Sequence, residues 1–251
     1  MIDSRTIPIR FSNLKRMADS PRHYQWAINH PFEASRTMRI GTIAHALILG
    51  ESTPLAVYDG TRRGKEWEAF KAAHEGREIV SPAEYDAARP IAEAVRNDAD
   101  ATRVLDGVHE EHIAWEYCGR AASSRPDVRG ATFVTDLKTT RSAHPGRFGR
   151  DAYWRGYHAQ LAFYQMACGL PATSPCYIVA VENVAPYCVT VFRADQAAID
   201  AGHMQCRAWF ERLLVCEASD HWPGYASGIQ SFGLPEQDTL DLTFGDEEEA
   251  S

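Results

Sequence analysis

The chain has 251 residues, of which 45% are hydrophobic and 24% are charged. That length suits one large domain, and that hydrophobic fraction is ordinary for a globular protein with a substantial core. No apolar run approaches the roughly 20 residues that a membrane-spanning helix needs, and residues 1–5 lack the apolar centre of a signal peptide. These features exclude an integral membrane protein and predict a cytoplasmic one without a membrane partner.

The first 108 residues have the pattern of a helical region. Ser12 is a good N-cap, and Ser81 is followed by Pro82 and Glu84, which is the pattern of a capping box. One stretch, 39–49, is apolar on most sides, so we expect that helix to be buried. The expected helices cover 12–17, 21–29, 39–49, 65–75, 82–98 and 101–105.

After residue 108 the pattern changes to short strands. Gly119-Arg120 and Arg129-Gly130 are plausible hairpin turns between three strands, and a basic loop over 141–150 leads to a long helix. The expected strands cover 111–118, 121–128, 132–138, 176–181 and 187–192, and the expected helices cover 154–168 and 195–216.

This order predicts an α/β fold with a mixed central sheet flanked by helices. We expect a single domain over 1–222, with a helical part at 1–108 and a sheet-and-helix core at 109–216, followed by a flexible acidic tail at 223–251.

The charge is unevenly distributed along the chain. The net charge is −8, but the segment 217–251 holds nine acidic residues and no Lys or Arg. Within 119–158 there are eight basic residues against three acidic ones, which suits a polyanionic substrate. The alternative is that these arginines only solvate loops.

The six cysteines carry no metal-binding spacing. None belongs to a C-x-x-C pair, which disfavours a zinc ribbon, and none is clustered as in iron–sulfur sites. We expect reduced and mostly buried thiols.

The most informative pattern is Pro126-Asp127 followed by Asp136-Leu137-Lys138. On a strand, Asp136 and Lys138 point to one face while Leu137 points into the core. An antiparallel hairpin would place Asp127 opposite that segment. Two carboxylates with the Leu137 backbone carbonyl suit Mg²⁺ or Mn²⁺, and a bound metal activates water beside a phosphodiester. An ordinary Asp–Lys surface pair is the alternative.

Two further motifs hold polar side chains in apolar surroundings. His45 lies in the apolar stretch that follows Gly41, and Gln160 and Tyr164 are four residues apart, so they share one helical face. His45 on its own fits a core histidine with one hydrogen bond. Gln160 and Tyr164 fit either a half-buried polar pair or a site that holds a carboxylate, a water or DNA.

Taken in order, these motifs resemble the PD-(D/E)xK nuclease superfamily, which has a restriction-endonuclease-like core. The branch that they resemble most is that of RecE/exonuclease VIII-like and phage λ-exonuclease-like proteins, over about residues 10–195. The segments that carry the resemblance are Ser12-x-Leu14, Ser20-Pro21-x-x-Tyr24, Gly41-x-x-x-His45, Glu116, Pro126-Asp127, Asp136-Leu137-Lys138-Thr139-Thr140 and the helix 157–164.

The resemblance implies an Mg²⁺-dependent 5′-to-3′ exonuclease that acts on ends of double-stranded DNA and leaves 3′ single strands. Mn²⁺ would substitute for Mg²⁺. It also implies a ring-shaped homo-oligomer, a single-strand annealing protein as partner, and a bacterial or phage-infected host cell. The implied catalytic and metal-site residues are Asp127, Asp136, Lys138, His45 and Glu116, together with the Leu137 carbonyl. Glu110 or Glu111 would replace Glu116 if the strand register differs.

The implied substrate-binding residues are Gln160 and Tyr164. A basic residue must also hold the 5′ phosphate, and the candidates are Arg36, Arg39 and Arg141, each of which is alternatively a solvated loop arginine. Other functions remain open: a RecB-like or Cas4-like nuclease, an endonuclease of the same fold, or a catalytically silent protein that binds DNA ends. The acidic segment 238–249 is either a solvated tail or a docking peptide for a basic partner.

Overall fold

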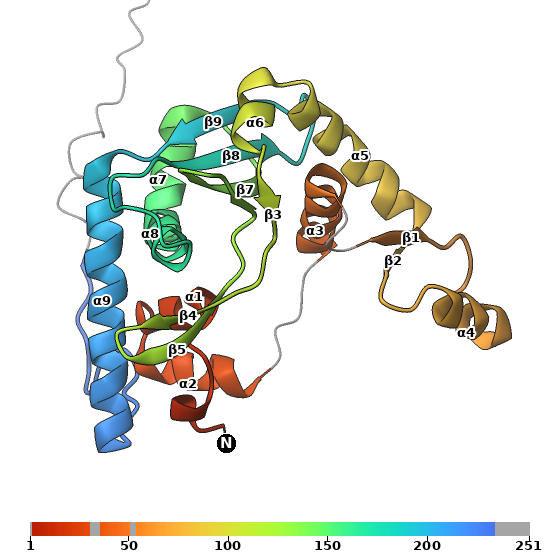
Figure 1. Ribbon diagram of the computed structural model, residues 1–251. Helices are drawn as coiled ribbons and strands as arrows, with labels where there is room; N and C mark the ends of the chain where they lie inside the picture. The colour runs from red at the N-terminus through yellow and green to blue at the C-terminus, as the bar shows by residue number, and fades with distance from the viewer. Residues whose placement is uncertain (1, 31–35, 51–53, 234–251) are drawn as a thin grey trace, which may run out of the picture.

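The computed structural model describes residues 2–30, 36–50 and 54–233. Its centre is a mixed five-stranded sheet with the order β3-β6-β7-β8-β9, in which only β7 and β8 run parallel. Helices cover both faces of this sheet (Figure 1), so the predicted fold class is confirmed. The strands are β3 (Val108–His109), β6 (Val128–Arg129), β7 (Val134–Thr140), β8 (Cys176–Glu182) and β9 (Val189–Arg193).

The predicted three-strand meander is interrupted in the structure. The strand expected at 121–128 ends at Ser124, and β4 (Ile113–Tyr117) and β5 (Arg120–Ser124) form a separate antiparallel hairpin. The chain resumes pairing as β6, next to β3 instead of β4. Pro126 explains the break, because proline has no N–H for the ladder and restricts the residue before it. Strand β6 therefore begins one residue after Asp127.

Two layers of helices enclose the sheet. On one face, Leu137 of β7 and Val179 of β8 pack with α3 (Arg36–Leu49), α5 (Pro82–Arg96) and α6 (Ala99–Val104). On the other face, Ile178 and Ala180 pack with α7 (Pro145–Trp154), α8 (Tyr157–Ala167) and α9 (Gln196–Ser219). This alternation is the period of two that a strand buried on both faces requires.

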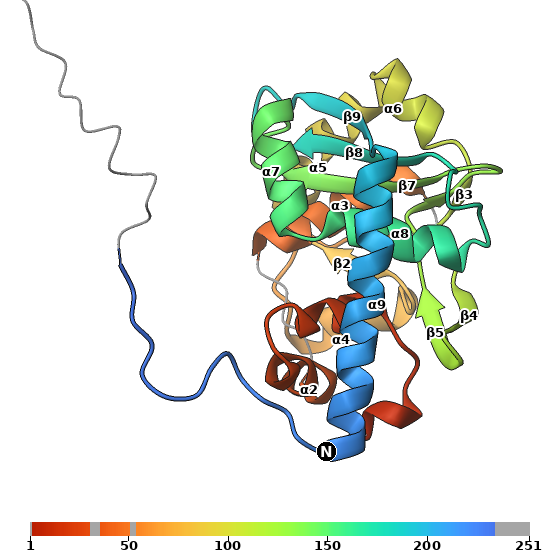
Figure 2. The same cartoon turned by 90° about the vertical axis from the view of Figure 1, so that its left-hand side faces the viewer.

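The N-terminal helices and the β4–β5 hairpin form a third packed cluster with α8 and α9. Helix α9 runs past both the sheet and this N-terminal group and joins them (Figures 1 and 2). Ile9 pairs with Ala122 as a short extra strand beside β5, which fixes the start of the chain. The N-terminal elements are η1 (Ser4–Thr6), α1 (Phe11–Leu14), η2 (Lys15–Met17) and α2 (Pro21–Asn29).

Local signals fixed several boundaries correctly. Ser81 accepts a hydrogen bond from the Glu84 N–H and the Glu84 side chain accepts one from the Ser81 N–H, so the predicted capping box is present. Two segments differ from the prediction. The expected loop at 141–150 contains most of α7, because Pro145 at its first position outweighs two helix-weakening glycines. Residues 54–80 form two strands that were not predicted, β1 (Leu55–Val57) and β2 (Glu78–Val80), on either side of α4 (Gly64–Ala73), which corresponds to the expected helix 65–75. This small unit projects from the core (Figure 1).

Residues 223–233 follow α9 without regular structure, and the remainder of the acidic tail, including 238–249, lies outside the described residues. The division of the chain at residue 222 therefore stays a prediction. Within the described ranges, none of the helices combines the length and the hydropathy that crossing a bilayer requires.

Helices α8 and α9 approach each other closely at Gly202. A Cβ atom there would lie 2.5 Å from the backbone oxygen of His158. Because backbone cannot move aside cheaply, Gly202→Ala should lower the free energy of unfolding by about 1–3 kcal/mol. Gly149→Ala on α7 is the matched control, since a Cβ there meets nothing within 4 Å, and it should stabilise by up to about 1 kcal/mol. Urea denaturation measures both; equal effects would contradict this packing.

Candidate active site

The centre of the site is strand β7. Asp136 and Lys138 lie on the face of the strand that carries α8, while Leu137 between them is fully buried against the opposite layer of helices. Asp136 is only 2% exposed. The alternation expected from the sequence thus places an acid and a base side by side in the interior.

Asp127 lies directly across from Asp136. The antiparallel pairing of Val128 with Thr135 puts Asp127 at the next position of the ladder. Its Oδ2 accepts a hydrogen bond of 2.7 Å from the Leu137 N–H. The break at Pro126 frees the carboxylate to make this bond in place of a ladder bond. The two acids are therefore adjacent, as the spacing predicted.

One half-buried cation, Lys138, offsets the charge of the carboxylates. Lys138 Nζ makes an ion pair with Asp136 Oδ2 and lies 4.8 Å from the centre of the Tyr157 ring. Burial opposes the ammonium charge, but the charges of Asp136 and Asp127 outweigh it and raise the pKa of Lys138. Burial raises the pKa of Asp127, and it raises the pKa of Asp136 to about 6, with the Asp127 charge acting in the same direction.

His45 approaches the acids from helix α3. Its Nδ1 is 3.9 Å from Asp127 Oδ2, and the ring hydrogen-bonds to the Leu137 carbonyl. Burial lowers the pKa of His45 to about 4, so the ring is neutral at pH 7. Gly41, one turn earlier, explains the close approach: a Cβ there would lie 2.7 Å from Thr139 Oγ1 of β7. The Gly41-x-x-x-His45 motif therefore serves both packing and the site.

Gln160 and Tyr164 face the acids from α8. The Gln160 side chain donates a 3.1 Å hydrogen bond to the Tyr164 hydroxyl. Burial raises the pKa of Tyr164, and the negative charges of Asp136 and Asp127 raise it further, so the phenol stays protonated beside the carboxylates. The pair can donate hydrogen bonds toward the site, as its spacing on one helical face suggested.

Glu116 is not brought to the cluster. It lies on β4, in the separate hairpin, with its side chain exposed. Glu110 is placed there instead: its N–H donates to the Asp127 carbonyl, and its charge acts on both Asp127 and His45. Its φ of 46° marks a sharp turn after β3. The expectation for Glu116 fails because the break at Pro126 detaches β4 from the sheet.

The three candidate arginines lie at different places. The side chain of Arg36 is outside the described residues. Arg39 makes ion pairs with Glu84 at 3.0 Å and Glu78 at 3.6 Å, so it joins α3 to α5 and β2. Arg141 is exposed just after β7 and lines a cavity of about 210 Å³.

Sequence reasoning missed a second group of cations. A cavity of about 360 Å³ beside Gln160 and Tyr164 is lined by Arg10, Lys15 and Arg125. Arg10 and Lys15 are brought there by the pairing of Ile9 with β5. The only local signal was the position of Lys15 directly after Ser12-x-Leu14.

The residues present fit one hard divalent cation. Among residues 2–30, 36–50 and 54–233, no three His, Cys, Asp or Glu side chains are arranged to hold a metal by themselves. Two adjacent carboxylates and the Leu137 carbonyl remain as donors, and all are oxygen. Mg²⁺ is commonly bound by one or two carboxylates while it keeps several waters. Asp136 Oδ2 pairs with Lys138 but has no hydrogen bond of regular geometry, so it is a donor that such an ion would use.

Comparisons with known proteins agree with this geometry. The family model of a PDDEXK-like domain of unknown function, DUF3799, matches residues 10–234. The chain belongs to this family. The predicted membership of the PD-(D/E)xK superfamily is thereby confirmed. None of the curated proteins matches the chain at a significant level.

Solved structures with a similar fold exist. The crystal structure of a candidate exonuclease from Eubacterium rectale has a TM-score of 0.61 at 15% identity, over 92% of each chain. A phage-related exonuclease from Haemophilus somnus gives a TM-score of 0.38 at 13% identity, over 86% of this chain and 97% of that one. The first comparison establishes a shared fold.

Mg²⁺ binding should depend on pH in a defined direction. A proton on Asp136 competes with the ion, and with a pKa of about 6 this side chain is mostly ionised at pH 7 and mostly protonated at pH 5. The apparent affinity for Mg²⁺ should fall about tenfold from pH 7 to pH 5. Titration calorimetry measures this, with Asp136→Asn as the control that lacks the titrating group. An affinity that is constant across this range would contradict the assignment.

Glu110 and Glu116 provide a matched pair of variants. Glu110→Gln removes a charge that acts on Asp127 and His45, so it should weaken Mg²⁺ binding by about tenfold. Glu116→Gln removes an exposed charge of the β4–β5 hairpin and should leave binding unchanged. The reverse order of effects in the same titration would show that the placement of these residues is wrong.

Proposed function

We propose that the protein is an Mg²⁺-dependent deoxyribonuclease that hydrolyses DNA from double-stranded ends. The observation that supports this most is the adjacency of Asp127 and Asp136, together with the ion pair between Lys138 and Asp136. Membership of the PDDEXK-like family agrees with this arrangement. An ion pair kept only for stability would seldom place a buried acid next to a second, half-buried acid with one lysine, since burying charge is costly.

In the proposed reaction, Asp127 and Asp136 hold the divalent ion, with the Leu137 carbonyl and His45 beside them. The ion, when bound, lowers the pKa of a coordinated water and stabilises the charge that develops on the phosphate. Lys138 donates a hydrogen bond that orients the attacking water or offsets the phosphate charge. Tyr164 and Gln160 donate hydrogen bonds to the substrate or support the carboxylates.

The cavity lined by Arg10, Lys15 and Arg125 supports an activity at DNA ends. It adjoins Gln160 and Tyr164, so a terminal phosphate bound there would place the next phosphodiester near the carboxylates. Arginine recognises phosphate through two parallel hydrogen bonds. We propose this group in place of Arg36, Arg39 and Arg141 as the 5′-phosphate site. A 5′-to-3′ polarity, a ring-shaped homo-oligomer and a single-strand annealing partner rest on the resemblance alone.

The second candidate is a RecB-like or Cas4-like nuclease or an endonuclease of the same fold. All six cysteines are free thiols, and three of them are buried, which disfavours the iron–sulfur versions. An endonuclease would cut closed circular DNA, whereas an enzyme that requires an end would not. A catalytically silent relative would cut neither.

The activity test uses linear and closed circular duplex DNA with Mg²⁺. We expect the wild-type protein to degrade the linear form and to spare the circular form, and labels on the 5′ and 3′ ends will give the polarity. Cleavage of circles would favour the endonuclease, and no cleavage of either would contradict the proposal.

Substitutions at the centre of the site provide the second activity test. Asp136→Asn and Lys138→Ala should each reduce turnover by about 100-fold or more, because each removes a group that acts on the reacting phosphate. Lys71→Ala is the matched control, since Lys71 is exposed on α4 and pairs with Glu68 at the surface. Circular dichroism would verify the fold of each variant. Full activity of either site variant would refute the assignment.

A further inference from the structure

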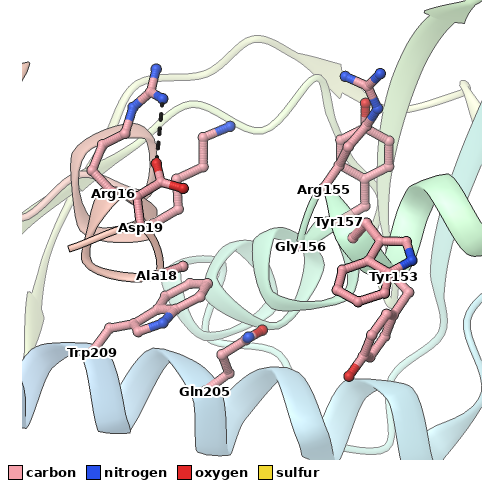
Figure 3. A pocket seen from close by; sticks show the side chains of 11 residues that line it. Arg16, Ala18, Asp19, Tyr153, Arg155, Gly156, Tyr157, Gln205 and Trp209 are labelled. Atoms are coloured by element: carbon pink, nitrogen blue, oxygen red, sulfur yellow. Dashed lines mark ion pairs between the residues drawn. The ribbon is translucent and has the colours of Figure 1, made fainter. Parts of the chain in front are cut away.

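A second cavity shares Lys15 with the proposed phosphate site. It has a volume of about 240 Å³ and lies between η2 and the junction of α7 with α8. Figure 3 shows Arg16 and Asp19 on one wall, Tyr153, Arg155 and Tyr157 on the other, and Gln205 and Trp209 of α9 at its base. None of the functions proposed above uses this cavity.

The cavity has the composition of a site for single-stranded nucleic acid. Three cations line it, Lys15, Arg16 and Arg155, together with the single acid Asp19. Arg16 makes an ion pair with Asp19 at 3.9 Å (Figure 3), so Lys15 and Arg155 are the cations offered to a phosphate. Beside them Trp154 is 82% exposed although it is a large aromatic residue. Proteins that bind unpaired strands combine basic grooves with aromatic rings on which bases stack. An exposed tryptophan next to three basic residues therefore points to a base with its phosphate.

The cavity is connected to the catalytic centre by two side chains. Tyr157 lines its wall, and the ring of Tyr157 lies 4.8 Å from Lys138 Nζ. Lys15 lines this cavity and also the one that holds Gln160 and Tyr164. A strand that passes over Lys15 would therefore reach the carboxylates from either cavity.

The size of the cavity limits its occupant. At about 240 Å³ it is smaller than the roughly 300–1,000 Å³ pockets that enclose drug-sized ligands. It suits one base better than a base pair. A stretch of duplex would have to be unpaired before a base could enter it.

We propose that this cavity binds one unpaired nucleotide of the DNA next to the scissile phosphate, with its base on Trp154 and its phosphate between Lys15 and Arg155. The inference rests on the proposed nuclease function and adds to it a specific base-stacking residue. Trp154 would thus help to hold the strand end separated from its complement while the catalytic residues act.

The test measures coupling between the Trp154 ring and a base of the DNA. Binding of labelled duplexes with a short unpaired end is followed by fluorescence anisotropy in EDTA, which prevents hydrolysis. We expect Trp154→Ala to weaken binding about tenfold. In the wild type, one abasic nucleotide near the end should cause a similar loss, and in Trp154→Ala the same abasic nucleotide should cause no further loss.

Trp26→Ala is the matched control, because Trp26 is also an exposed tryptophan, at 65%, but lies on α2 and does not line the cavity. It should bind like the wild type. Equal abasic losses in wild type and Trp154→Ala would overturn the proposal, as would unchanged binding by Trp154→Ala or an equal loss on fully paired blunt duplexes. If the wild type hydrolyses DNA with Mg²⁺ and one of these results is found, only this inference fails; if the wild type hydrolyses nothing, the proposed function fails first.

Discussion

One hydrogen bond organises the site: the Leu137 N–H donates to Asp127 Oδ2 at 2.7 Å. It joins Asp127, which precedes β6, to the backbone of Leu137 in β7. The neighbours of Leu137 along that strand are Asp136 and Lys138. A carboxylate fixed by a backbone N–H cannot turn away from the second acid, although the two repel each other when both are ionised. The sheet keeps the two carboxylates close together despite this repulsion, and a cation bound between them would reduce the repulsion.

The surrounding elements follow from this constraint. The break at Pro126 is necessary, because in a regular ladder the Leu137 N–H would make a ladder hydrogen bond and would not be available to the Asp127 side chain. Gly41 lets α3 approach β7, which brings a neutral His45 to the rim of the acids. Helix α8 closes the other side with Tyr157, Gln160 and Tyr164. The site is thus built from elements on both faces of one strand.

The local parts of this arrangement were accessible from sequence. The spacing of Asp127, Asp136 and Lys138 predicted their adjacency, because strand alternation and hairpin register are short-range properties. The capping box at Ser81 was predicted for the same reason. Glu110 was less accessible, since its place depends on which strand β6 pairs with. Lys15 and Arg10 were inaccessible, because a pairing between Ile9 and Ala122 joins segments more than 100 residues apart.

The proposed function depends on the binding of a divalent cation by Asp127 and Asp136 together. Anomalous diffraction from crystals soaked with Mn²⁺ tests it most directly. We expect a single strong anomalous peak within coordination distance of oxygens from both Asp127 and Asp136. A peak elsewhere with none at these residues, or side chains of the two acids that point to opposite faces of the sheet, would contradict it.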